Sequence, residues 1–169
     1  MQFNKKYYVK LKKIFKYSDA YGLPNRFWVN GDSVYYTNSI GESSNFKICF
    51  MFFKEPCFKF AAAMEADKIL SDDLRSETIE NILEDKVKKY ETFPKFSEFE
   101  INKIVDRSKN GYSKSFYNGI EFPTDILYYL FDLFDIKNLK KNCVCDLDEK
   151  NKIFTIGCPI GIFMVKSNT

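Results

Sequence analysis

The side chains best suited to catalysis are three aspartates, Asp125, Asp132 and Asp135, in one predicted helix. Asp125 and Asp132 are seven positions apart and therefore share a helix face, with Asp135 close by. Carboxylates grouped in this way hold the metal ions of two-metal nucleases. The same spacing is typical of the solvated side of an amphipathic helix, which is the interpretation we favour. A metal-dependent nuclease that uses these three residues is kept as an alternative hypothesis.

The chain contains no histidine, and this excludes several kinds of catalytic and metal-binding site. Without imidazole there is no Ser-His-Asp or Cys-His nucleophile and no His-ligated zinc or iron. Neither GxxxxGK[ST] nor GxGxxG, the two glycine-rich phosphate-binding patterns, occurs in the sequence. We therefore expect a protein that is not an enzyme, with no catalytic residues, no metal and no cofactor.

Five cysteines, an odd number, follow an N-terminal segment that lacks the apolar run of a signal peptide. They are Cys49, Cys57, Cys143, Cys145 and Cys158. A structural zinc site needs four ligands, usually as two close pairs, and only Cys143 and Cys145 are close. We expect buried free thiols in a reducing cytoplasm. No apolar run reaches the roughly 18 residues of a membrane span, so we expect no membrane association.

Two surfaces are candidates for binding a partner. The segment from Tyr112 to Gly119, predicted to be a loop, mixes aromatic residues with one lysine, and four of its side chains could contact a protein: Tyr112, Lys114, Phe116 and Tyr117. The same loop could stack on nucleic-acid bases or fold onto the core. An acidic helix face could dock a basic partner through Glu77, Glu80, Glu84 and Asp85.

Lysines are concentrated near the N-terminus, at Lys5, Lys6, Lys10, Lys12, Lys13 and Lys16. Such residues could follow a phosphate backbone, so a nucleic-acid-binding accessory protein is the second alternative. Lysines of this kind more often form a solvated face or protect an edge strand from aggregation. Phe and Tyr number eighteen and eleven, more rings than one core of this size is expected to hold, so some should reach the surface.

The elements that would position these residues indicate an α+β fold in a single domain, residues 1–169. The order is an N-terminal β-hairpin or meander, three central helices and C-terminal β strands. Tyr7 to Tyr17 fits a strand slightly better than a helix, since Tyr7, Val9, Leu11, Phe15 and Tyr17 alternate with polar positions. The predicted strands are 26–29 and 34–36, joined by Asn30-Gly31, then 45–53, 143–147, 152–156 and 162–166.

The predicted central helices have clear boundaries. Residues 61–70 have helix-favouring composition, and residues 72–90 carry acids early and lysines late, which suits the helix dipole. Ser97 and Glu100 form a capping box for a helix to about Lys109, with Phe96 and Ile101 as a hydrophobic staple. Pro123 is placed to open the last and most apolar helix.

In size, cytosolic character and aromatic content, the chain is similar to the immunity proteins of bacterial toxin systems, including those of contact-dependent growth inhibition. The resemblance is one of general character. It implies a non-catalytic inhibitor that blocks a cognate toxin, often a nuclease, and a phage-encoded inhibitor of host defence would have the same character. The expected partner is therefore a protein.

Overall fold

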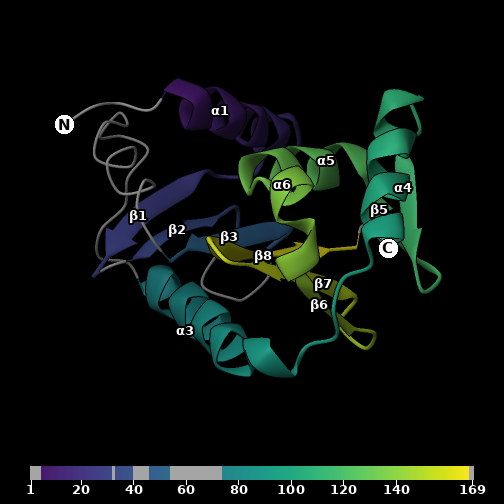
Figure 1. The fold of residues 1–169 in the computed structure, drawn as a ribbon. Helices are drawn as coiled ribbons and strands as arrows, with labels where there is room; N and C mark the ends of the chain where they lie inside the picture. Colours follow the sequence, from purple (N-terminus) through teal and green to yellow (C-terminus); the bar gives the residue numbers. More distant parts are fainter. Residues whose placement is uncertain (1–4, 32, 40–45, 54–73, 168–169) are drawn as a thin grey trace.

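The computed structural model describes residues 5–31, 33–39, 46–53 and 74–167. A six-stranded antiparallel sheet runs through the middle of the molecule (Figure 1). Its strands, in spatial order, are β1 (Arg26–Asn30), β2 (Ser33–Thr37), β3 (Ile48–Phe52), β8 (Gly161–Lys166), β7 (Ile153–Cys158) and β6 (Val144–Asp148). The sheet is thus two three-stranded meanders that meet at its centre, where Phe50 of β3 lies opposite Phe163 of β8.

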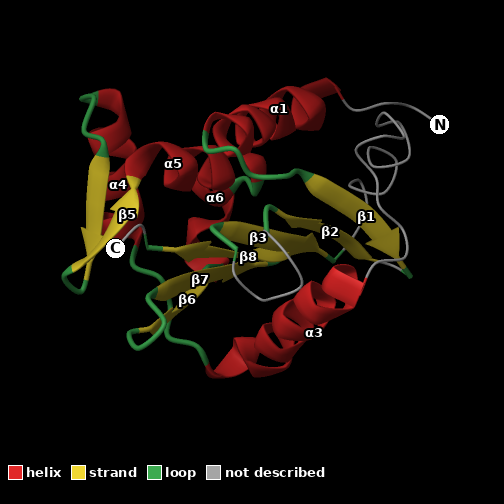
Figure 2. Cartoon of the chain, turned by 180° about the vertical axis from the view of Figure 1, so that it is seen from behind, coloured by secondary structure: helices red, strands yellow, loops and turns green. Residues whose placement is uncertain are grey.

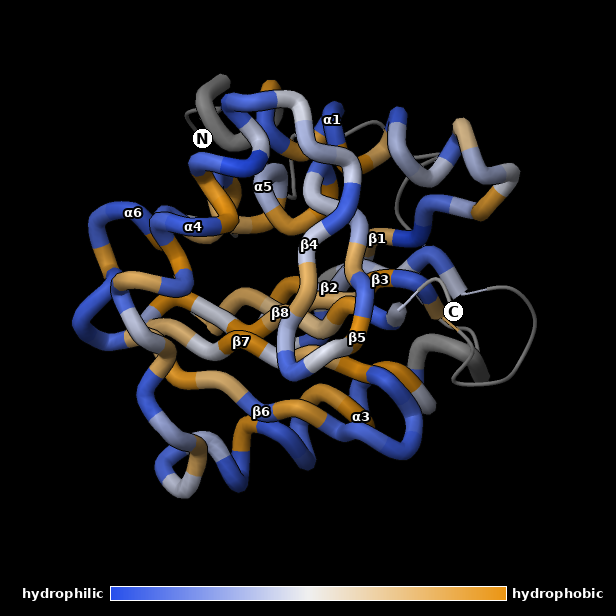
Figure 3. The backbone as a smooth tube through the Cα atoms, turned by 90° about the vertical axis from the view of Figure 1, so that its right-hand side faces the viewer, coloured by the Kyte–Doolittle hydropathy of each residue, from blue (hydrophilic) through white to orange (hydrophobic). Residues whose placement is uncertain are grey.

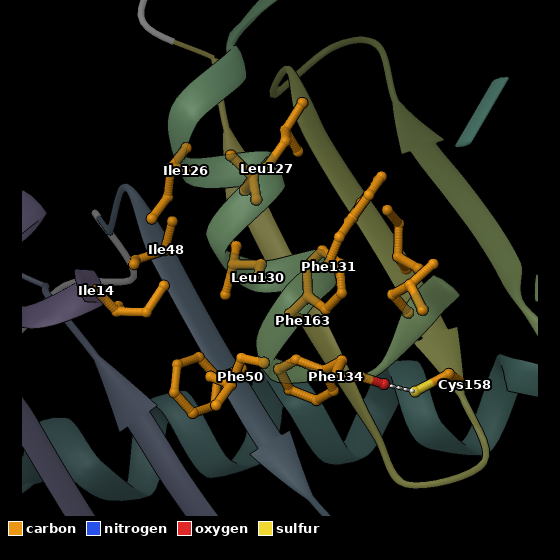
Figure 4. Packing of buried hydrophobic residues seen from close by; sticks show 14 of the residues in the cluster. Ile14, Ile48, Phe50, Ile126, Leu127, Leu130, Phe131, Phe134, Cys158 and Phe163 are labelled. Atoms are coloured by element: carbon orange, nitrogen blue, oxygen red, sulfur yellow. Dashed lines mark hydrogen bonds between the residues drawn. The ribbon is translucent and has the colours of Figure 1, made fainter. Parts of the chain in front are cut away.

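Helices cover both faces of this sheet (Figures 1 and 2). On one face lie α1 (Lys5–Ala20), α5 (Thr124–Leu133) and α6 (Ile136–Leu139), and on the other lies α3 (Leu74–Lys89). Alternate strand residues therefore enter two different cores, as the pleat requires. The core on the α1–α5 side holds Phe27, Tyr36, Phe50 and Phe163 of the sheet. Phe134, at the end of α5, packs beside Phe50 and Phe163 (Figure 4). The α3 side holds Trp28, Tyr35, Met51 and Ile162, with Ile79 and Leu83 of the helix.

A smaller unit completes one end of the molecule. It consists of α4 (Glu98–Lys109), which packs against α5, and of a two-stranded hairpin, β4 (Lys114–Tyr117) and β5 (Ile120–Pro123). Seen from this end, the hairpin lies in front of β7 and β8 (Figure 3). Short 3-10 turns follow α3 and α6 at Tyr90–Thr92 and Lys140–Asn142.

The α+β class and most of the predicted elements are confirmed. Ser97 Oγ accepts a hydrogen bond from the Glu100 backbone N–H at 3.3 Å, so the helix begins where the capping signal placed it. The β1–β2 hairpin is present, but Asn30 pairs with Ser33 and the turn begins at Gly31 (φ 59°), one residue later than predicted. All five residues of β3 are buried, as expected for a central strand. Predictions for residues 61–70, for Asn45 and for Cys57 lie outside the described residues.

The prediction of a strand over Tyr7–Tyr17 is wrong, because this segment belongs to helix α1. Leu11, Ile14 and Phe15 are buried at helical spacing against the α1–α5 side of the sheet, and Ser18 continues their stripe. Val9, which the strand pattern placed inside, is 56% exposed. The order of lysines and aromatics here fits both the two-residue period of a strand and the 3.6-residue period of a helix. The segment is a helix because its apolar side packs against α5.

The predicted loop over Tyr112–Gly119 is also wrong, because most of it forms the β4–β5 hairpin. Its turn is Asn118-Gly119, with φ of 48° and 77° between the paired residues Tyr117 and Ile120. Two positive φ angles in a two-residue loop are the signature of a type I′ turn, which Asn-Gly favours. The Asn-Gly pair at positions 118 and 119 therefore marks a hairpin turn.

Candidate protein-binding surface

Exposed aromatic side chains collect at the end of the molecule formed by α4 and the β4–β5 hairpin. Phe99 is 74% exposed, Phe116 59% and Tyr112 55%. Among the residues with described side chains, the other exposed large apolar groups are Val9 (56%) and Tyr21 (52%), both on or next to α1. Three exposed rings, on α4, in the turn after it and on β4, form a patch rather than a scatter of single residues.

The helix α4 places Phe99 on its outer side. Ile101 and Ile104 are buried and form the inner stripe of the helix. Phe99 is two residues from Ile101, about 200° around the helix axis, so it points to the opposite side. Lys103 follows one turn after Phe99 on that outer side.

Arg107 joins α4 to the hairpin. Its Nε donates to the backbone oxygen of Lys114 at 2.8 Å, and its second terminal nitrogen donates to the same oxygen. The guanidinium also lies 4.6 Å from the centre of the Tyr112 ring, a cation–π arrangement. These contacts connect the helix, the turn after it and the first hairpin strand.

A hollow of about 430 Å³ lies between α4 and the hairpin. Phe99 and Phe116 both line it, and Lys103 and Arg107 lie between them in sequence on the helix side. A second, shallower hollow lined by Phe99, Arg107 and Tyr112 continues along the outer side of the helix. We call the residues Phe99, Lys103, Arg107, Tyr112 and Phe116 the α4–hairpin surface.

The four residues predicted from the aromatic segment fall on two sides of the hairpin. Lys114 and Phe116 are exposed on its outer side, and Lys114 pairs with Glu121 at 3.4 Å. Tyr112 is exposed in the turn that precedes the hairpin. Tyr117 instead points inward, since its ring stacks on Phe154 at 4.5 Å. Its hydroxyl lies 3.4 Å from the thiol of Cys145, so this side chain anchors the hairpin to the core.

Sequence reasoning missed Phe99, Lys103 and Arg107. A signal for Phe99 was present, because a large aromatic residue lay off the apolar stripe of a helix with well-defined caps. No comparable signal existed for Arg107. Its role depends on the distance between helix and hairpin, which local sequence does not encode.

The acidic residues proposed on α3 are in part engaged within the protein. Glu80 accepts hydrogen bonds from Trp28 Nε1 at 2.7 Å and from Asn30 Nδ2 at 3.0 Å. Glu84 accepts one from the Tyr35 hydroxyl at 3.0 Å. The other two residues are exposed, and Asp85 pairs with Lys89 at 3.2 Å while Glu77 lies one turn before Glu80. Two of the four carboxylates thus attach the helix to the sheet.

The three aspartates of the nuclease hypothesis do not gather around a metal position. Asp132 pairs with Lys10 of α1 at 3.3 Å, and Asp135 accepts a hydrogen bond from Asn138 at 2.8 Å. Asp125 is exposed in the first turn of α5. Within the described part of the chain, no group of three or more Cys, Asp or Glu residues could hold a metal ion.

The four described cysteines are free and buried, as predicted. Burial raises the pKa of Cys143 to about 12 and of Cys158 to about 11. It also raises the pKa values of Cys49 and Cys145. Cys158 points its thiol toward the backbone oxygen of Phe134, 3.8 Å away (Figure 4). At neutral pH these thiols are protonated and function as small apolar groups.

The N-terminal lysines with described side chains lie on α1 and not along a strand face. Lys10 is held by Asp132, and Lys13 lies 5.9 Å from the Tyr129 ring. Lys16 is exposed. A regular strand-like row of charges for a phosphate backbone is therefore not formed.

Comparisons of the chain with protein-family models, with curated proteins and with solved structures gave no match. None of the helices within the described ranges is long and apolar enough to cross a membrane. Interpretation of function therefore rests on the geometry of the surface.

Proposed function

We propose that this chain is a non-catalytic binding protein that contacts a protein partner through the α4–hairpin surface. The observation that carries the proposal is the pair of exposed rings, Phe99 and Phe116, that line one hollow. Exposed aromatic rings are unfavourable in water and become strongly favourable when a partner covers them. Aromatic residues and arginine are also the side chains that most often dominate the energy of protein interfaces.

The rigidity of the surface supports the proposal. Arg107 connects α4, Tyr112 and the β4 backbone, and the inward Tyr117 ties the hairpin to Phe154. A surface held in its binding shape loses little conformational entropy on association, which increases affinity. Neighbouring Lys103 adds a positive charge beside the rings and would favour acidic groups on the partner.

The more specific proposal is that the partner is a bacterial toxin and that the chain is its immunity protein, with a phage inhibitor of host defence as the close variant. A rigid aromatic patch next to a hollow suits steric occlusion, which requires only complementary shape and a few buried anchors. Co-expression with the candidate toxin would test this role. The chain should rescue growth, and a variant with Phe99→Asp should not.

Site-specific photo-crosslinking tests the binding surface itself. A benzophenone amino acid would be placed at position 99 or 116 and, as matched controls, at Glu77 and Asn81 on the exposed side of α3. We expect one crosslinked protein from host cells with the first pair and none with the second. Crosslinking only from α3 would refute the proposal, and a crosslinked species sensitive to nuclease digestion would favour the nucleic-acid alternative.

A further inference from the structure

A third hollow lies between α4, α5 and α6. It has a volume of about 380 Å³, within the range of roughly 300–1,000 Å³ that small-molecule sites occupy. It contains none of the five residues of the α4–hairpin surface, although Asn102 and Asp106 line both this hollow and the shallower one beside Phe99 and Tyr112. Its lining has two distinct parts, one apolar and one basic.

The apolar part forms the inner wall. Ile101 and Phe131 are almost fully buried in the protein core, at 1% and 4% exposure, and the half-buried Val105 and Tyr128 extend the wall outward. An apolar group seated here would lose contact with water against four apolar side chains from two helices. Burial of this kind is favourable in proportion to the apolar area removed from water.

The basic part consists of Lys109 on α4, Lys137 on α6 and Lys140 just after it. Among the described residues, neither Lys109 nor Lys137 forms an ion pair, while Lys140 binds Asn102 at 2.6 Å and lies 3.8 Å from Glu98. Two carboxylates also line the hollow, but Asp132 is paired with Lys10 at 3.3 Å. Within the described ranges, two lysines without an ion pair, Lys109 and Lys137, therefore face one carboxylate without an ion pair, that of Asp106, and the hollow keeps an excess of positive charge.

We propose that this hollow binds a small amphipathic anion, a molecule with an aromatic or aliphatic body and a carboxylate or similar head group. The body packs on Ile101, Val105 and Phe131, and the head group lies among Lys109, Lys137 and Lys140. Charge and apolar wall together define the ligand, since a purely polar anion would leave the wall exposed and a neutral apolar molecule would leave the excess positive charge unbalanced.

The test uses three matched probes: 4-phenylbutyrate, its neutral amide and its cationic amine analogue. Binding is followed by NMR through the methyl signals of Ile101 and Val105 during titration. We expect saturable shifts with the carboxylate at millimolar concentration, since so small a ligand gains little binding free energy. The amide should bind roughly tenfold more weakly, and the amine should give no saturable shift.

Substitutions of lysine test which positive charges bind the head group. The double variant Lys109→Gln/Lys137→Gln should weaken 4-phenylbutyrate binding roughly tenfold. The matched control, Lys88→Gln/Lys150→Gln, removes two exposed lysines from α3 and from the β6–β7 turn and should bind like the wild type. Equal binding of the three probes, equal losses in both variants or the absence of saturable shifts would overturn the proposal. None of these results depends on the protein partner or on the α4–hairpin surface.

Discussion

Helices α3 and α4 both carry polar residues on one side and a buried apolar stripe on the other, yet their outer residues have different roles. On α3, Glu80 and Glu84 accept hydrogen bonds from Trp28 and Tyr35 of the sheet. On α4, Phe99 is 74% exposed, and within the described chain no element covers it. One helix uses its charged residues to hold itself in place, and the other presents an apolar group to solvent.

This difference bears on two common signals of a binding surface, a run of charged residues and an exposed aromatic ring. A run of carboxylates beside a strand rich in Trp and Tyr has internal donors within reach, so its charge alone does not indicate a partner. An aromatic ring on the polar side of a helix has no such internal use. Exposed apolar area is therefore the more informative of the two signals in this protein.

The largest expected effect concerns the partner identified by crosslinking. Replacing both Phe99 and Phe116 by Ala should weaken its binding by roughly 2–4 kcal/mol, because central aromatic residues dominate interface energies. The free energy of unfolding should change by less than about 0.5 kcal/mol, since both side chains are exposed. Calorimetric titration and urea denaturation measure the two quantities. Val9→Ala, another exposed apolar truncation, should change neither, and an unaffected double variant would remove the distinction between the helices.

A smaller effect should appear in the stability of the α3 side. Glu80→Ala leaves the buried Trp28 N–H and Asn30 without their acceptor, which should lower the free energy of unfolding by roughly 1–2 kcal/mol. Glu77→Ala, one turn earlier and exposed, should stay within about 0.5 kcal/mol of the wild type. Urea denaturation followed by Trp fluorescence measures both. A Glu80→Ala variant of wild-type stability with weakened partner binding would make α3 the docking surface.

The smallest effect is a dependence on alkaline pH. Burial and the hydrogen bond to Glu84 raise the pKa of Tyr35 above its usual value of 10.0. This stabilisation is present in full below pH 10, where the unfolded tyrosine is neutral, and is lost as the pH rises toward the folded-state pKa. Tyr35→Phe should therefore reduce the loss of stability above pH 10, at a cost of about 1 kcal/mol at neutral pH.

Thermal denaturation between pH 8 and pH 11 would measure this profile. The Phe99→Ala variant removes no ionisable group and should keep the wild-type slope. A Tyr35→Phe profile parallel to that of the wild type would show that the tyrosine–glutamate contact contributes nothing to the attachment of α3.

Local signals in the sequence predicted much of the fold. The Ser97 cap, the lysines at the end of α3 and the last three strands each depend on a few neighbouring residues, and the structure confirms them. Helix α1 was missed because its choice between two periods depends on contacts with α5, more than 100 residues away. The β4–β5 hairpin was missed although Asn118-Gly119 signals it, since its strands are only four residues long.

The candidate surface was predicted in part. Tyr112 and Phe116 were named from composition, but whether a residue of the hairpin points outward depends on register. A shift by one position would have exposed Tyr117 and buried Phe116. The hydrogen bonds of Glu80 and Glu84 bridge about 50 positions and could not be read from α3 alone.

The central position of β8 in the sheet has a consequence for folding during synthesis. Because synthesis proceeds from β1 to β8, the first meander is made early. Its strand β3 has no partner on one side until β8, the last of the strands, has been synthesised. During that interval the backbone groups and apolar side chains of β3 are open to pairing with other nascent chains. A chaperone, or a low rate of translation that keeps nascent chains few, should therefore increase the yield of folded protein more than its final stability.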